Sequence, residues 1–183
     1  LLTGAEEVRR GQSHTVVSGP EIAFNTCKEL LSTFSPTLRY VSASVGHASS
    51  IEIAVGQILL FQTTSYALAL AIANQDNVPV QAIVDTLDQS PLIKTPFFPY
   101  YAGTMTNRHY ENPVWKVGNM AKSVKMFARH LKEAGVGTEF FQPIVNMTET
   151  LVKNGLEDKN FTAIYETLIP AEKFTPELAE AAN

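Results

Sequence analysis

The longest hydrophobic pattern in the chain lies between residues 45 and 77. Its positions recur at intervals of three or four, which predicts one long helix. The pattern runs through Ile51, Val55, Ile58, Leu59, Gln62, Tyr66, Leu70 and Ala73. No lysine or arginine occurs between Arg39 and Lys94, so this helix is apolar on nearly all sides. A helix of this kind is expected to be buried on most of its faces.

The residues before this helix show a strand, helix and strand pattern. His14 to Ser18 and Leu38 to Val41 are short and rich in β-branched or aromatic residues, as strands are. Apolar residues at helical spacing between Pro20 and Phe34 predict a helix between them. Since two strands do not form a stable sheet alone, we expect this segment to be the edge of a larger sheet completed outside the chain.

Helical patterns dominate the remainder of the sequence. Apolar stripes predict helices over residues 79–88, 113–134, 140–153 and 161–168, whereas the aromatic stretch KTPFFPYYAGTM has no clear period. The predicted fold class is therefore mainly α. We expect the edge of a larger α/β sheet over residues 1–45, an all-helical domain over 46–170, and a flexible acidic tail over 171–183.

Composition excludes several classes of function. The net charge of −4 argues against nucleic acid or an anionic membrane surface as a partner. Polar side chains such as Glu52, Gln57 and Gln62 argue against a membrane span. The four histidines show no metal-ligand spacing, and the single cysteine, Cys27, permits no internal disulfide, which is consistent with a cytoplasmic protein.

Three features could carry chemistry, and each has a simpler structural alternative. Glu52 lies near the start of the apolar helix, where a buried carboxyl could exchange protons near neutral pH or an exposed one could complement the helix N-terminus. The cluster around Phe97 and Tyr101 could line an apolar pocket or form core. The stripe Lys122, Lys125, Arg129 and Lys132 could bind phosphate or be a solvated helix face.

The sequence around the predicted interdomain helix resembles a known family. TVVSGPE, followed by a helix and then LRYVSASVGHASSIEIAV, is similar to the domain junction of the imine reductases and reductive aminases. These belong to the β-hydroxyacid dehydrogenase (6-phosphogluconate dehydrogenase-like) superfamily. The family pattern Gly-x-Ala-Ser-x-x-Asp-x-Ala-Leu is matched by Gly46, Ala48, Ser49, Glu52, Ala54 and Val55. The resemblance extends from about His14 to Leu168.

The resemblance implies a two-domain reductase. Its members pair an NADPH-binding Rossmann domain with a helical domain, and two subunits exchange helices in a homodimer built on the long helix. The substrate is a small molecule, a cyclic or open-chain imine, held in a cleft. The family acid falls on Glu52, the pocket would include Phe97, Tyr101 and Leu60, and Lys122 would contact the cofactor.

The departures from the family leave two alternatives open. Glu52 replaces the usual aspartate, and Leu60 takes the place of a common tyrosine. Oxidation of a small hydroxy acid is the first alternative, and it is less favoured because the related hydroxyacid dehydrogenases carry a catalytic Lys and Asn that this helix lacks. A non-catalytic helical dimerisation domain is the second.

The sequence contains no glycine-rich dinucleotide-binding loop. The nearest match, Gly135-Val-Gly137, lacks the third glycine of that motif. We therefore expect that the main NADPH-binding domain lies outside this chain.

Overall fold

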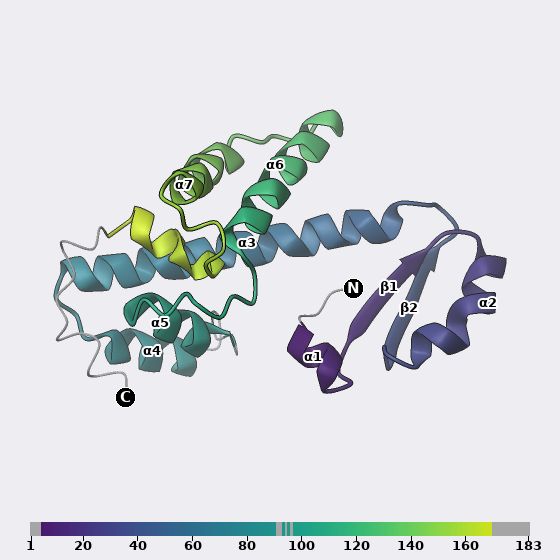
Figure 1. The fold of residues 1–183 in the computed structure, drawn as a ribbon, viewed down its shortest axis with the longest axis horizontal. Coiled ribbons are helices and arrows are strands. Elements are labelled where there is room, and N and C mark those ends of the chain that lie inside the picture. Colours follow the sequence, from purple (N-terminus) through teal and green to yellow (C-terminus); the bar gives the residue numbers. More distant parts are fainter. Residues whose placement is uncertain (1–4, 91–92, 94, 96, 170–183) are drawn as a thin grey trace. The chain divides into compact units, whose positions relative to one another are not determined.

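The structure is a computed structural model that describes residues 5–90, 93, 95 and 97–169 (Figure 1). It divides into two compact units, Leu1–Leu59 and Leu60–Asn183. The predicted flexible tail, residues 171–183, lies outside the described residues. The mainly helical fold class that the sequence predicts is confirmed, with seven α-helices, one 3-10 helix and one two-stranded sheet among the described residues.

The first unit is built around two parallel strands. Helix α1 (Ala5–Arg9) precedes β1 (His14–Ser18), and α2 (Glu21–Ser32) connects β1 to β2 (Thr37–Ser42). The ring of Phe24 on α2 stacks on Tyr40 of β2 with centroids 4.9 Å apart, which fixes α2 against one face of the sheet. No residue of α2 is buried. The strand–helix–strand prediction is thus confirmed, with the strands parallel as in a βαβ unit.

Helix α3 (His47–Gln75) is the predicted long helix, and it is continuous. Its buried side chains lie at helical spacing and all belong to its C-terminal part: Leu60, Thr63, Tyr66, Ala67, Leu70 and Ala73. Ile58, Leu68 and Ile72 are more than half exposed, so the chain itself does not bury most faces of the helix as the pattern predicts. By length and composition alone α3 could also cross a membrane, a test that core helices of soluble proteins pass as well.

The second unit packs short helices around the C-terminal part of α3. These are α4 (Val80–Gln89), α5 (Phe98–Thr106), α6 (Val117–Glu133), α7 (Phe141–Lys153) and the 3-10 helix η1 (Phe161–Thr167). Phe61 of α3 meets Phe141 of α7 edge to face at 5.3 Å, and Tyr66 meets Phe98 of α5 at 4.7 Å. Helices α6 and α7 lie side by side, and η1 contacts α5, α6 and α7 (Figure 1). This unit therefore contains most of the buried apolar core.

The turn after α7 caps the start of α6. The backbone N–H groups of Val117 and Gly118, which have no partner within α6, donate to the carbonyls of Lys159 and Glu157 at 2.9 Å each. A Cβ atom at position 118 would lie 3.2 Å from the Glu157 carbonyl oxygen, so glycine permits this close approach. The capping fixes the C-terminal end of α7 beside the N-terminal end of α6.

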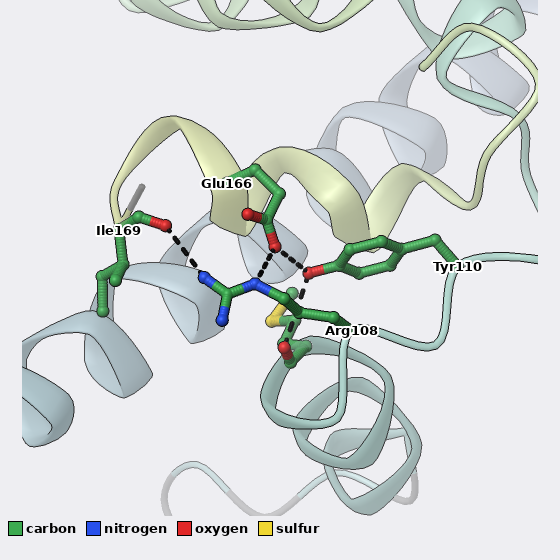
Figure 2. A network of polar contacts seen from close by, with 5 residues as sticks. Arg108, Tyr110, Glu166 and Ile169 are labelled. Atoms are coloured by element: carbon green, nitrogen blue, oxygen red, sulfur yellow. Dashed lines mark hydrogen bonds and ion pairs between the residues drawn. The ribbon is translucent and has the colours of Figure 1, made fainter. Parts of the chain in front are cut away.

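A polar clasp fastens η1 to the loop between α5 and α6 (Figure 2). Oε1 of Glu166 accepts hydrogen bonds from Arg108 Nε and from the Tyr110 hydroxyl, both at 2.7 Å. The guanidinium of Arg108 also donates to the carbonyl of Ile169 at 3.2 Å. Since Arg108 and Glu166 are each only about one-fifth exposed, with side-chain fractions of 21% and 18%, their pairing is shielded from solvent.

The structure differs from the sequence predictions at four elements. Helix α1 and helix α5 were not predicted, because the first residues show no period and prolines interrupt the aromatic stretch. The sixth helix begins at Val117 instead of residue 113, after a loop that the clasp organises. The last predicted helix is a 3-10 helix.

Candidate active site

The carboxyl ends of β1 and β2 meet the N-terminus of α3 within the first unit. Ser18, the last residue of β1, accepts a hydrogen bond from the backbone N–H of Ala48 through Oγ at 3.0 Å. Ser42, the last residue of β2, lies 2.8 Å from His47 Nδ1 through its Oγ. Gly46 has φ +102°, a conformation that favours glycine and turns the chain from β2 into α3. The carboxyl edge of a parallel sheet is where α/β folds bind ligands.

Glu52 lies just over one turn into α3, after this junction, and its side chain is exposed. Its neighbour Ile51 lines a hollow of about 350 Å³ over the sheet. The other lining residues are His14, Val16, Arg39, Tyr40 and Val41. The carboxylate of Glu52 is therefore accessible near the strand ends of the first unit. Its predicted role as an acid stays a prediction.

The three predicted pocket residues belong to the second unit. Phe97 and Tyr101 stack with ring centroids 6.3 Å apart; Phe97 is 47% exposed, whereas Tyr101 is buried. Leu60 is fully buried in the core. Burial raises the pKa of the Tyr101 hydroxyl, and the nearby Thr63 side chain opposes that shift. The structure thus brings Phe97 and Tyr101 together and places Leu60 and Tyr101 among core side chains.

Tyr100 and Asn160 extend this aromatic cluster. The Asn160 side chain donates from Nδ2 to the Tyr100 hydroxyl at 2.6 Å, and its Oδ1 accepts from the Thr162 backbone N–H at 3.1 Å. The backbone donor settles which end of the amide faces Tyr100. No local pattern predicts this contact, because the two residues are 60 positions apart and Asn160 stands in an ordinary helix-cap setting.

Lys122 lies on the exposed face of α6, in a groove between α6 and α7. From the sequence, Ser18 and Ser42 at the strand ends were not identified as candidate site residues. Small polar residues shortly before a helix are a recognised signal of a helix N-terminus. Among the described residues, no group of three or more His, Cys, Asp or Glu side chains is arranged to hold a metal ion.

The fold is similar to that of dehydrogenases of known structure. 3-Hydroxyisobutyrate dehydrogenase (ygbJ) from Salmonella typhimurium is 20% identical, with a TM-score of 0.78 over 90% of this chain and 57% of its own. The Mycobacterium tuberculosis 3-hydroxyisobutyrate dehydrogenase with L-serine is 13% identical, with a TM-score of 0.75 over 91% of this chain and 58% of its own. Psf3 in complex with NADP+ and 2-OPP is 16% identical, with a TM-score of 0.74 over 91% of this chain and 57% of its own. The chain thus spans a little over half the length of these proteins.

A comparison with curated proteins gives no match. In contrast, the model of one domain family, described as the NADPH-dependent reductive aminase-like C-terminal domain, matches residues 44–170, well over half of the chain. This range begins at the junction between β2 and α3 and includes Glu52, the aromatic cluster and the clasp. The chain therefore belongs to the family of NADPH-dependent reductive aminase-like C-terminal domains.

Proposed function

We propose that the chain is the substrate-binding and dimerisation part of an NAD(P)H-dependent oxidoreductase that reduces an imine to an amine. The family match over residues 44–170 carries this proposal. Within that range Glu52 occupies the position of the acid in the motif that opens the long helix. The intact protein is proposed to act in the cytoplasm on a small molecule.

The reaction adds a hydride to the imine carbon and a proton to the imine nitrogen. The described residues form no glycine-rich loop, so they do not fit the whole dinucleotide, and we assign no step to a bound cofactor on this chain. NADPH, held mainly outside this chain, would supply the hydride. Psf3, whose fold is similar, was solved with NADP+. The part left to this chain is to orient the imine and to deliver the proton from the carboxyl group of Glu52.

The substrate would lie against the aromatic cluster of the second unit. Phe97 offers an exposed ring that stacks on the buried Tyr101, and Leu60 is proposed to contribute to the same pocket. An apolar wall with few polar groups suits a cyclic or branched imine. Lys122 is proposed to contact the negatively charged cofactor.

The exposed apolar stripe of α3 supports a homodimer. Leu68 and Ile72 are 51% and 55% exposed and lie four residues apart, so they share one face of the helix. Exposed apolar side chains that line one face of a helix are typical of an interface. We propose that a second copy of the protein covers this face.

Two other functions have some support. A non-catalytic dimerisation domain is favoured by the exposure of Glu52, since an exposed glutamate near a helix start also complements the helix dipole. Oxidation of a hydroxy acid is named for two proteins of similar fold, but at 20% and 13% identity the likeness shows the fold alone. The long helix also lacks the Lys and Asn of that reaction.

Steady-state assays of the intact protein separate the three functions. NADPH consumption with a cyclic imine, such as 2-methyl-1-pyrroline, is expected, and NADP+ reduction with 3-hydroxyisobutyrate is not. Reduction of NADP+ by the hydroxy acid would replace the proposal by the first alternative. No turnover with either substrate, together with no binding of NADPH in calorimetry, would favour the non-catalytic domain.

A further inference from the structure

One polar atom inside the aromatic cluster of the second unit has no hydrogen-bond partner. Tyr101 is only 2% exposed, and its buried hydroxyl makes no hydrogen bond with any residue that the structure describes, the nearby Thr63 included. A hydroxyl that gives up its hydrogen bonds to water on burial and gains none destabilises the folded protein. Native proteins contain few such groups, and each calls for a physical explanation. The Tyr101 hydroxyl therefore points to a ligand.

The two tyrosines beside Tyr101 differ from it in this respect. The Tyr66 hydroxyl accepts a hydrogen bond from Gln62 Nε2 at 3.1 Å. The Tyr100 hydroxyl accepts one from Asn160 Nδ2 at 2.6 Å. Both rings lie against the Tyr101 ring, with centroids 5.7 Å and 5.8 Å from its own. Two hydroxyls of the cluster thus connect parts of the second unit, whereas the hydroxyl of Tyr101 connects nothing.

The chemistry of this hydroxyl defines the ligand that it suits. Burial raises the pKa of Tyr101, so the hydroxyl keeps its proton at neutral pH and can donate a hydrogen bond. The rings around it offer apolar surface and no strong acceptor. A matching ligand therefore combines an apolar body with one acceptor oxygen that reaches the hydroxyl.

The ring of Phe97 is the part of the cluster that is best able to admit such a ligand. It lies on the Tyr101 ring with centroids 6.3 Å apart and is 47% exposed. Tyr66 is buried, and the hydroxyls of Tyr66 and Tyr100 are held by hydrogen bonds. The Phe97 side chain has no polar atom that could hold it in the same way. Rotation of this ring opens the Tyr101 side chain to the solvent side of the cluster.

We propose that Tyr101 is a specificity-determining residue, whose hydroxyl donates a hydrogen bond to an oxygen atom of the substrate after the Phe97 ring has moved aside. This inference rests on the reductase function proposed above, in which Glu52 serves the imine nitrogen. Tyr101 would then recognise a second polar atom, remote from the C=N bond. The substrate class is a small imine that also carries an ether or carbonyl oxygen. A purely hydrocarbon imine would leave the hydroxyl unpaired in the filled site and would be a poorer substrate.

Steady-state kinetics of the intact protein with two matched imines test this inference. One is a dihydro-oxazine with a methyl group on the imine carbon, and the other is the tetrahydropyridine that has a CH₂ group in place of the ring oxygen. The unaltered protein should have the higher kcat/KM for the dihydro-oxazine. Tyr101→Phe should lower the ratio of the two kcat/KM values about tenfold, mainly through KM, since the hydrogen bond forms in the bound substrate as well.

Tyr66→Phe is the matched control. It removes a neighbouring buried hydroxyl that already has a partner, so it should leave the ratio as in the unaltered protein. Thermal unfolding without substrate separates the two tyrosines further. Tyr101→Phe should unfold at the same temperature as the unaltered protein or at a higher one, whereas Tyr66→Phe should unfold at a lower one because Gln62 loses its partner.

The outcomes distinguish this inference from the reductase function on which it rests. Turnover of both imines with the same ratio in Tyr101→Phe and the unaltered protein would overturn the role of Tyr101 and leave the reductase function standing. An equal fall of the ratio in Tyr66→Phe would also overturn that role, because it would trace the effect to packing of the cluster. A protein that reduces neither imine would overturn both proposals.

Discussion

The carboxylate of Glu166 and the guanidinium of Arg108 form a 2.7 Å ion pair across 58 positions of the sequence. The same carboxylate oxygen accepts the Tyr110 hydroxyl, so one acid fixes two donors from a single loop (Figure 2). Arg108 and Tyr110 belong to the loop that leads from the aromatic helix α5 to α6, and Glu166 belongs to η1. The clasp therefore fixes how the aromatic cluster sits against the rest of the second unit.

Removing the acid of the clasp should destabilise the protein markedly. Glu166→Ala removes the carboxylate that the Arg108 guanidinium and the Tyr110 hydroxyl share in a partly buried site, at a cost of about 2 kcal/mol in the free energy of unfolding. Chemical denaturation monitored by circular dichroism measures this difference. Lys125→Met, which breaks a solvent-exposed ion pair, is the control and should cause no measurable loss.

The clasp should also make stability depend on pH at the alkaline end. Burial and the hydrogen bond to Glu166 raise the pKa of Tyr110 well above its usual value. Above about pH 10 the unfolded chain loses this proton while the folded protein keeps it, so the free energy of unfolding falls as pH rises.

Denaturation curves at pH 8, 9, 10 and 11 measure this slope. Tyr110→Phe should lose less stability than the unaltered protein between pH 9 and 11, although it starts lower because the hydrogen bond is gone. The slope should not vanish, because burial also raises the pKa of Tyr101 and of Tyr165. Identical slopes in the two proteins would contradict the assignment to Tyr110.

The exposed stripe of α3 should carry the dimer. Leu68→Glu combined with Ile72→Glu places two charges on the apolar face and should convert a dimer to a monomer in sedimentation velocity experiments. Met126→Glu changes a residue of α6 that is 44% exposed; it is the matched control and should remain dimeric. An unaltered protein that is monomeric at micromolar concentration would exclude this interface.

Local periodicity explains which parts of the fold could be predicted from the sequence. The β-branched and aromatic residues of β1 and β2 and the three- or four-residue spacing in α3, α6 and α7 reflect local backbone preferences, so the existence of these elements follows from the pattern. Helix α5 was not predicted because prolines interrupt the aromatic stretch, although proline is tolerated in the first turn of a helix, where Pro99 lies.

The site was harder to predict, because it depends on contacts between distant residues. The Arg108–Glu166 pair and the Asn160–Tyr100 bond join positions 58 and 60 residues apart, and neither has a local signature. The apolar character of α3 indicates that something covers it, but not which molecule does so. For Glu52 the sequence specifies the position on the helix, whereas the surroundings of its carboxyl group depend on tertiary contacts that no local pattern encodes.

The acid at position 52 tests the central claim most directly, through three matched forms of the intact protein. Single-turnover reduction of a cyclic imine by NADPH should slow about 10²-fold or more in Glu52→Gln, while Glu52→Asp, which restores the family's residue, retains most of the rate. Glu21→Gln, an exposed acid in the first turn of α2, is the control and should react as the unaltered enzyme does. A rate for Glu52→Gln equal to that of the unaltered enzyme would contradict the account.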